Sequence, residues 1–263
     1  MPSAPHVVRA GAGPRLLLIH GSAADHSTWS IQLASSLREQ FTLITYDRRS
    51  DALTVEDHAD DAVALLAADP APAIVIGSSF GAVIALDAIR RHGSLFAGAV
   101  LIEPPMAASD GAPPEPELRK PALDVRVGFL AAFDLRAAEQ GGPAAAELFL
   151  RTVLGDASYE RMPRAYQERS KSKWAEIRAD SAALIAYRPR YAELAGVTTP
   201  VLLLGGERSA AYFRPTLEAL AAALADARLE VVPAAGHMLH AEAHRRFAEL
   251  VSEFARSVGL APS

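Results

Sequence analysis

A serine between two glycines carries the clearest sign of chemistry in the chain. Ser79 stands at the centre of Gly-Ser-Ser-Phe-Gly, residues 77–81, between a β-branched run at 72–76 and an alanine-rich stretch at 82–91. These flanks are typical of a buried parallel strand followed by a helix. A turn that tight strains its central residue, and small residues two positions to either side avoid clashes. It exposes one side chain at a helix N-terminus, so the Ser79 hydroxyl is a candidate nucleophile, although a glycine-bounded turn without any chemical role has the same local pattern.

A serine nucleophile needs a base, and three histidines are candidates. A serine hydroxyl is a poor nucleophile at neutral pH, so a neighbouring group must accept its proton, and histidine titrates in the right range. His237 follows the last predicted strand, whereas His240 and His244 fall at the start of the last predicted helix, where surface histidines are common. Their spacing would also suit a metal, but no further placed carboxylate or cysteine completes such a site. We expect neither a metal nor a cofactor.

Strands and helices alternate along most of the chain and would position these groups. Apolar runs predict strands at residues 7–10, 15–19, 41–47, 72–76, 97–102, 200–206 and 228–232. Periodic apolar residues predict helices at 27–40, 54–68 (capped by Thr54), 82–91, 213–225 and 241–257. The alternation implies an α/β fold with a mostly parallel sheet that helices cover on both faces.

The alternation of strands and helices stops between residues 106 and 196, where the sequence has no convincing strand pattern. A loop rich in proline, alanine and glutamate is expected at 109–121, followed by helices near 125–139, 143–154 and 172–187. An all-helical insertion between two strands is most economically a lid over the carboxyl edge of the sheet, where such folds bind ligands. The expected organisation is a core of residues 1–105 and 197–263 with a helical lid at 106–196.

Composition and charge exclude several classes of function. The chain has 263 residues and a net charge of −5, which argues against a nucleic-acid binder. Its apolar runs fall short of the ~20 residues of a membrane helix, and its N-terminus has no signal-peptide core. A cytoplasmic protein that does not bind membranes is expected. The absence of cysteine excludes disulfides, cysteine nucleophiles and thiolate metal sites.

Together these motifs resemble the α/β-hydrolase superfamily over nearly the whole chain. Three of them appear in the expected order, each after a predicted strand: a His-Gly pair at 20–21, the pentapeptide at 77–81 as a nucleophile elbow, and a Gly-His pair at 236–237. The resemblance implies that Ser79 is the nucleophile. It also implies His237 as the base, since His237 occupies the strand-to-helix loop that the family uses.

The same resemblance implies which groups stabilise the negative charge that develops on a substrate's carbonyl oxygen. The donors of the oxyanion hole would be the backbone N–H groups of Ser22 and Phe80. The His-Gly pair at 20–21 would then shape the loop and not take part in chemistry. The Asp-Arg-Arg stretch at 47–49 resembles a strand end of the family that is mostly structural.

The acid that would orient His237 is where the sequence departs from the usual pattern. The family commonly has Gly-x-x-Asp after the strand at 201–204, but this chain reads Gly-Gly-Glu-Arg-Ser, which leaves Glu207 one place early. The other location, seen in haloalkane dehalogenases and some lactone-opening hydrolases, is the end of the strand that follows the nucleophile helix, and Glu103 stands there. We predict Glu103 as the acid, with Glu207 and then Asp110 as alternatives. Glu103 could instead only cap the turn into the lid.

The resemblance implies a lidded serine hydrolase, esterase- or lactonase-like, that cleaves a small carboxylic ester or lactone through an acyl-enzyme on Ser79. Alternatives on the same residues are a cofactor-free haloperoxidase, a C–C hydrolase, a lyase, or a non-catalytic relative that binds a small molecule. Six apolar residues could line a cavity beneath the lid, or could simply pack helices together: Met106, Phe129, Phe133, Trp174, Tyr187 and Tyr191. The sequence predicts neither the substrate nor the oligomeric state.

Overall fold

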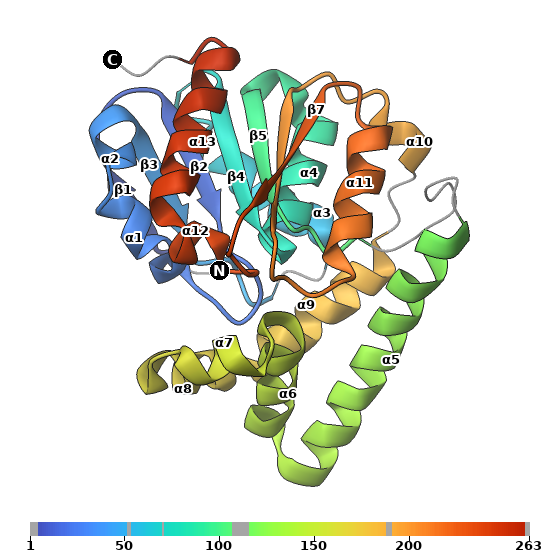
Figure 1. The fold of residues 1–263 in the computed structure, drawn as a ribbon. Helices are drawn as coiled ribbons and strands as arrows, with labels where there is room; N and C mark the ends of the chain where they lie inside the picture. Colours follow the sequence, from blue (N-terminus) through green and yellow to red (C-terminus); the bar gives the residue numbers. More distant parts are fainter. Residues whose placement is uncertain (1–4, 52–53, 70, 107–115, 188–190, 261–263) are drawn as a thin grey trace.

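The computed structural model describes residues 5–51, 54–69, 71–106, 116–187 and 191–260, with the backbone alone at 116–127 and at residue 192. Its centre is a seven-stranded sheet in the order β1-β3-β2-β4-β5-β6-β7 (Figure 1). β1 runs antiparallel to β3, and the other neighbouring pairs are parallel. The strands are β1 (Val7–Ala10), β2 (Arg15–Ile19), β3 (Thr42–Tyr46), β4 (Ala73–Ser78), β5 (Phe96–Ile102), β6 (Val201–Gly206) and β7 (Ala227–Val232). The predicted mostly parallel α/β sheet is confirmed.

Helices cover both faces of this sheet. They include α3 (Val55–Ala64), α4 (Phe80–His92) and α11 (Phe213–Ala223) on one face, and α1 (Ser30–Leu33) and α13 (His244–Ser257) on the other (Figure 1). Alternate strand residues enter the two apolar layers, as the period of two in a strand requires. On β2, Leu17 and Ile19 pack into the layer of α3, α4 and α11, whereas Leu16 and Leu18 pack with Trp29 and α13. Thr54 caps α3 with a capping box, as predicted.

A helical region is inserted between β5 and β6. It consists of α5 (Pro116–Gln140), α6 (Gly142–Leu154), α7 (Asp156–Arg161), α8 (Arg164–Ser172) and α9 (Trp174–Ala186), and Figure 1 shows it projecting from the sheet domain. Its own apolar cluster includes Phe133, Leu150 and Ile177, and Ala23 from the loop after β2 joins it. The next short helix, α10 (Tyr191–Leu194), packs instead into the core, because Tyr191 and Leu194 belong to the layer of α4 and α11.

The predicted helix at 27–40 is wrong as a continuous element. The structure has a short 3-10 helix, η1 (His26–Trp29), then α1, then α2 (Leu37–Gln40). The break has a local cause: the Ser35 hydroxyl donates to the carbonyl of Gln32 over 2.9 Å and accepts from the N–H of Leu37 over 3.2 Å. Serine side chains that bond to nearby backbone groups compete with the helical hydrogen bonds.

Three further helix predictions are corrected. The loop expected at 109–121 is wrong from Pro116 onward, because α5 begins there, and a proline is well suited to a first helical position. Helices α7 and α8 were not predicted, and the last helix is divided into α12 (Leu239–Glu242) and α13. Across the part of the chain that the structure describes, none of the helices has the length and apolar character to cross a membrane.

Candidate active site

Ser79 joins the end of β4 to the first residue of α4. Its φ of 55° and ψ of −121° are a strained combination for a residue other than glycine, costing about 1–3 kcal/mol. Close approaches explain the flanking glycines: a Cβ on Gly77 would collide with the carbonyl of Gly81, and a Cβ on Gly81 with the carbonyl of Ile19. The Ser79 N–H donates to the carbonyl of Ile102 over 2.8 Å, which fixes the turn against β5. Ser79 thereby lines two cavities at the carboxyl edge of the sheet.

A buried histidine and a buried carboxylate form a hydrogen-bonded pair beside this edge. The Nδ1–H of His237 donates to Oε2 of Glu103 over 2.5 Å, and the two side chains are 4% and 1% exposed. The other carboxylate oxygen accepts from the N–H of Gly206 over 2.7 Å, and Glu103 itself has a strained φ of 44°. The ring of Phe213 stacks on the imidazole, with centroids 4.5 Å apart. With Nδ1 engaged by Glu103, Nε2 is left as the nitrogen that can accept a proton.

Of the two other predicted acids, the structure describes only Glu207. Glu207 is exposed and accepts a hydrogen bond from the N–H of Ala234 over 2.7 Å, so it holds the loop after β7. Asp110 lies outside the described residues. Among the described residues, Glu103, directly after β5, has the carboxylate that accepts the hydrogen bond from His237.

Both residues predicted to supply the oxyanion donors lie near Ser79. Phe80 is the first residue of α4, and helix N-termini present unpaired N–H groups. Ser22 follows β2 and lines the same two cavities as Ser79. The loop passes close to Ser79, since a Cβ on Gly21 would lie 3.0 Å from the Cβ of Ser79. His20 is also buried, and burial together with the nearby guanidinium of Arg48 lowers its pKa to about 3, so it is neutral.

A buried ion pair holds this loop to the helical insertion. The guanidinium of Arg48 donates to both carboxylate oxygens of Asp180 on α9, over 2.7 and 3.0 Å, and each side chain is 5% exposed. The hydroxyl of Ser22 donates to the same carboxylate over 2.7 Å, and Arg48 donates to the carbonyl of Gly21 over 3.3 Å. Burial and Arg48 lower the pKa of the adjacent His58 to about 4. Arg48 thus has the structural role expected of it.

Sequence reasoning missed Asp180. The sequence pattern that could have indicated it is the position of Asp180 between two apolar residues at helical spacing. Ile177, Asp180 and Ala183 recur every three residues and form the buried side of α9. A carboxylate at such a position is rarely buried without a partner. The sequence could therefore have predicted a buried cation facing α9, although not that the cation is Arg48.

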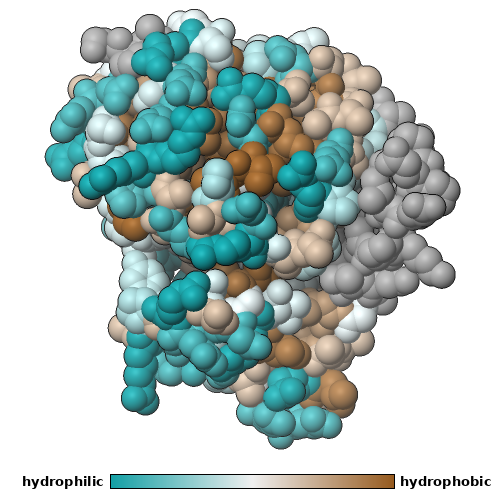
Figure 2. Space-filling view, in the orientation of Figure 1, coloured by the Kyte–Doolittle hydropathy of each residue, from teal (hydrophilic) through white to brown (hydrophobic). Residues whose placement is uncertain are grey.

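Two cavities meet at Ser79. The larger has a volume of about 700 Å³ and is lined by His237, by residues 21–24 of the loop after β2, and by side chains of α6, α7 and α8. The smaller, of about 90 Å³, is mainly apolar and is lined by Ser22, Ser79, Pro105, Met106, Phe129, Phe149, Thr152, Val153, Ser181, Leu184, Ile185, Tyr212, Phe213 and Thr216. In Figure 2, hydrophobic residues are visible in the hollow between the sheet domain and the insertion, and hydrophilic residues cover much of the rest of that face.

Of the six residues considered as cavity lining, Met106 and Phe129 line the smaller cavity. The others pack elsewhere. Phe133 is buried inside the insertion, Trp174 is 38% exposed, and Tyr191 lies in the sheet core. The hydroxyl of Tyr187 donates to Oδ1 of the buried Asp87 over 3.0 Å.

The three histidines near the C-terminus lie in different surroundings. The expectation that His240 is a surface residue is wrong: it is fully buried, with its ring centroid 4.7 Å from that of Trp29. Its short helix, α12, folds back onto the apolar layer of α13, and burial lowers the pKa of His240 to about 3. His244 is exposed, as expected.

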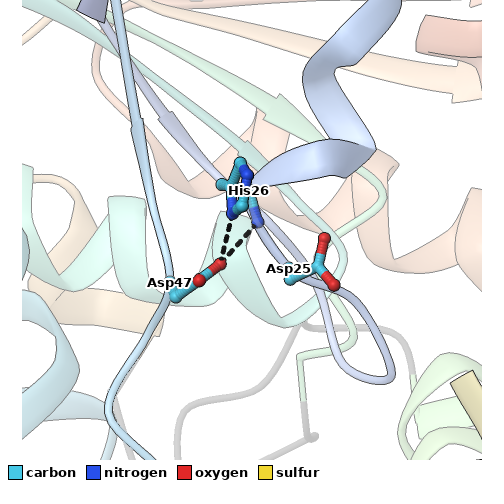
Figure 3. Close-up of side chains that lie close together, drawn as sticks. All are labelled: Asp25, His26 and Asp47. Atoms are coloured by element: carbon cyan, nitrogen blue, oxygen red, sulfur yellow. Dashed lines mark hydrogen bonds and ion pairs between the residues drawn. The ribbon is translucent and has the colours of Figure 1, made fainter. Parts of the chain in front are cut away.

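One group of potential metal ligands occurs among the described residues. Asp25, His26 and Asp47 offer ligand atoms within 4.8 Å of one another. These side chains already form hydrogen bonds within the protein. Asp47 accepts from the N–H and the Nδ1–H of His26, and Asp25 caps η1 by accepting from the N–H of Ser27. Figure 3 shows the dashed bonds between His26 and Asp47, with the Asp25 carboxylate set apart. These contacts give the cluster a structural role: Asp25 caps η1, and Asp47 holds the loop at His26.

Comparison with known proteins agrees with this architecture. The model of the alpha/beta hydrolase family matches residues 16–250. An uncharacterized hydrolase of Bacillus subtilis strain 168, YraK, is 41% identical over 98 residues, which are 33% of this chain and 36% of that protein, so the match spans about a third of the curated relative. An esterase structure from Thermogutta terrifontis has a TM-score of 0.75 at 24% identity, with 97% of this chain and 93% of that chain covered. For the enol-lactonase of Burkholderia xenovorans LB400 the TM-score is 0.74 at 23% identity, with 96% of both chains covered. The chain belongs to the α/β hydrolase family.

Proposed function

We propose that this protein is a serine hydrolase that cleaves a carboxylic ester or a lactone. The observation that carries the proposal is the buried pair of His237 and Glu103, which opens onto the same cavity as the strained Ser79. A base held in one tautomer by a buried carboxylate is what a serine nucleophile requires.

In the proposed reaction, Oγ of Ser79 attacks the carbonyl carbon while Nε2 of His237 takes the hydroxyl proton. The backbone N–H groups of Ser22 and Phe80 donate to the oxyanion that forms. The bond from the carbonyl carbon to the leaving oxygen then breaks, and His237 gives its proton to that oxygen. A water molecule attacks the acyl-enzyme in the same way, which releases the carboxylic acid and restores Ser79.

The ester or lactone class is supported by the chemistry of the cavities. A small apolar cavity and a larger one, both lined by Ser79, suit the two halves of an ester or the ring of a lactone. The esterase and the enol-lactonase among the similar structures share the fold. Haloperoxidase, C–C hydrolase and non-catalytic roles would use the same residues, and the experiment below separates ester hydrolysis from them.

The test is a panel of 4-nitrophenyl esters of increasing acyl length, measured with the wild type and Ser79→Ala. We expect turnover of some of these esters, and a loss of at least about 10⁴-fold in kcat in the variant. Ser252→Ala is the matched control, because Ser252 is a buried serine on α13, and it should retain activity. No turnover of any ester, or equal turnover by Ser79→Ala, would contradict the proposal.

A further inference from the structure

We propose that the two cavities at Ser79 select an ester with a short, uncharged acyl group and a larger, negatively charged leaving group. This inference rests on the proposed function. Three observations support this inference. His237 lines the larger cavity, the smaller cavity is small and apolar, and three arginines line the larger cavity.

The position of His237 decides which half of the substrate enters which cavity. The protonated imidazole must reach the leaving oxygen, so the leaving group lies on the histidine's side of the carbonyl. His237 and the adjacent Met238 line the larger cavity. The smaller cavity contains Ser22 and Ser79, which would contact the carbonyl, but its lining does not include His237. The larger cavity is therefore the leaving-group side, and the smaller one is the acyl side.

The acyl side is small and apolar. Its volume of about 90 Å³ leaves room for on the order of six water-sized groups, and so for an acyl chain of about that many carbon atoms. Phe129 and Phe149 of the insertion and Phe213 of the core form aromatic walls. A charged acyl group would lose its hydration there without gaining a partner. These walls favour short aliphatic acyl groups.

The leaving-group side is positively charged. Arg161 from α7, Arg169 from α8 and Arg208 from the loop after β6 line it, and Glu242 is the one carboxylate among its described lining residues. Glu242 is already engaged, because it accepts from the N–H of Gly236 over 2.9 Å and lies 3.7 Å from Arg208.

The other two arginines keep donors available for a ligand. Arg161 donates to the hydroxyl of Ser158 over 3.2 Å, a neutral partner. Arg169 lies over the ring of Tyr166 and 3.5 Å from the carboxylate of Asp25, a contact that uses one edge of the guanidinium. Guanidinium groups bind carboxylates and phosphates through paired hydrogen bonds.

The charge of this cavity contrasts with the rest of the molecule. The whole chain has a net charge of −5, so a generally basic surface does not explain why three arginines line one cavity, where Glu242 is the carboxylate among the described lining residues and Asp25 lies behind Arg169. A cavity of one sign concentrates ligands of the opposite sign. The complementary leaving group is an alcohol or phenol that carries a carboxylate or a phosphate.

The first test varies the charge of the leaving group at constant shape. The substrates are the butyrate esters of 4-hydroxybenzoic acid, of its neutral methyl ester, and of 4-hydroxyphenylphosphonic acid, with each rate divided by that of hydroxide hydrolysis. We expect kcat/KM for at least one anionic ester to exceed that for the neutral ester by about tenfold. The carboxylate and phosphonate esters distinguish the two kinds of anion.

Variants of the arginines test whether the larger cavity causes the preference for an anionic leaving group. Arg161→Gln combined with Arg169→Gln should reduce the ratio of anionic to neutral kcat/KM towards one. Arg178→Gln is the matched control, because Arg178 also lies in the insertion but pairs with Asp134 and does not line the cavity, and it should keep the ratio. A ratio near one in the wild type, or an unchanged ratio in the double variant, would overturn the inference on charge.

The second test varies acyl length with a fixed leaving group. The wild type should prefer acyl chains of about two to six carbons, and Phe129→Ala should move the optimum to longer chains. A wild-type optimum at twelve carbons or more would overturn the assignment of the smaller cavity. In either test, hydrolysis of the neutral butyrate that depends on Ser79 leaves the proposed function standing. Absence of Ser79-dependent hydrolysis of every ester tested, charged or neutral, would instead contradict the proposed function.

Discussion

The sheet domain and the helical insertion contribute differently to this molecule. The sheet domain supplies Ser79, His237 and Glu103, each at the carboxyl end of a strand or in the loop that follows one, and apolar layers hold it together. The insertion supplies walls of both cavities and is tied to the sheet domain by buried polar contacts, including Arg48 with Asp180 and Tyr187 with Asp87. The proposed chemistry therefore belongs to one region, while the proposed selectivity depends on both. Changes in the two regions should have distinguishable effects.

The largest effect within the sheet domain, after loss of Ser79 itself, is expected for Glu103→Gln. The amide cannot stabilise the positively charged imidazole and can favour the wrong tautomer, so kcat should fall by about 10³–10⁴-fold with little change in KM. Glu207→Gln is the matched control at the end of the neighbouring strand, and its kcat should stay close to wild type. A large loss in Glu207→Gln with a small loss in Glu103→Gln would reverse the assignment of the acid.

The next effect concerns the attachment of the insertion. Asp180→Ala leaves the guanidinium of Arg48 buried without its carboxylate, so the free energy of unfolding should fall by about 3–5 kcal/mol. Asp134→Ala removes the exposed pair with Arg178 within the insertion and should cost at most about 1 kcal/mol. Urea denaturation of both variants measures the difference. Equal losses would mean that the buried pair does not hold the two regions together.

For each group concerned, a smaller effect on stability is expected from lowering the pH. His20, His58 and His240 of the sheet domain have pKa values lowered to about 3, 4 and 3, mainly by burial. The unfolded chain binds a proton at each imidazole near pH 6.5 and the folded chain does not, so stability is full above pH 6.5 and falls as the pH is lowered. Each group should contribute about 2 kcal/mol of this loss between pH 6.5 and 5.

A variant checks this pH dependence at one position. His240→Phe keeps an aromatic ring against Trp29 but cannot bind the proton, so urea midpoints measured at pH 7 and pH 5 should differ less than in the wild type. His244→Gln removes an exposed histidine from the following helix and should leave the difference as it is. The same difference in His240→Phe as in the wild type would show that this imidazole does not contribute.

The smallest effect is expected for Tyr187→Phe, at the end of α9. The variant removes one hydrogen bond to Asp87, which still accepts from Arg90 and Arg91, so the loss should be about 1 kcal/mol. Tyr166→Phe changes a half-exposed tyrosine of the insertion and should be close to neutral in the same thermal denaturation. If Tyr187→Phe lowered the free energy of unfolding several times more than expected, the contact of Tyr187 with Asp87 would stabilise the protein about as much as the pair of Arg48 and Asp180.

The sheet domain could be predicted from local patterns because its signals are local. Buried strands have continuous apolar runs, and the elbow at Ser79 is marked by glycines that the close approach of α4 requires. Glu103 could be placed because it directly follows a strand whose end meets the same sheet edge as Ser79.

The helical insertion was predicted, but its short helices were not, and several contacts could not be predicted because they join residues far apart in the sequence. The partner of Asp180 is Arg48, 132 residues away, and burial of His240 depends on how α12 meets Trp29. The break in the helix at Ser35 rests on side-chain hydrogen bonds that compete with a strong apolar period. Helices α7 and α8 are short and mostly polar, so they lack a clear apolar pattern.

The most direct test of the central claim is labelling with a fluorophosphonate, which reacts with a serine activated as a nucleophile. The account predicts one label per chain, located at Ser79 by peptide mass spectrometry, and parallel loss of ester hydrolysis. It also predicts no labelling of Ser79→Ala and much slower labelling of Glu103→Gln. Labelling at another residue, or full labelling of Ser79→Ala, would contradict the account.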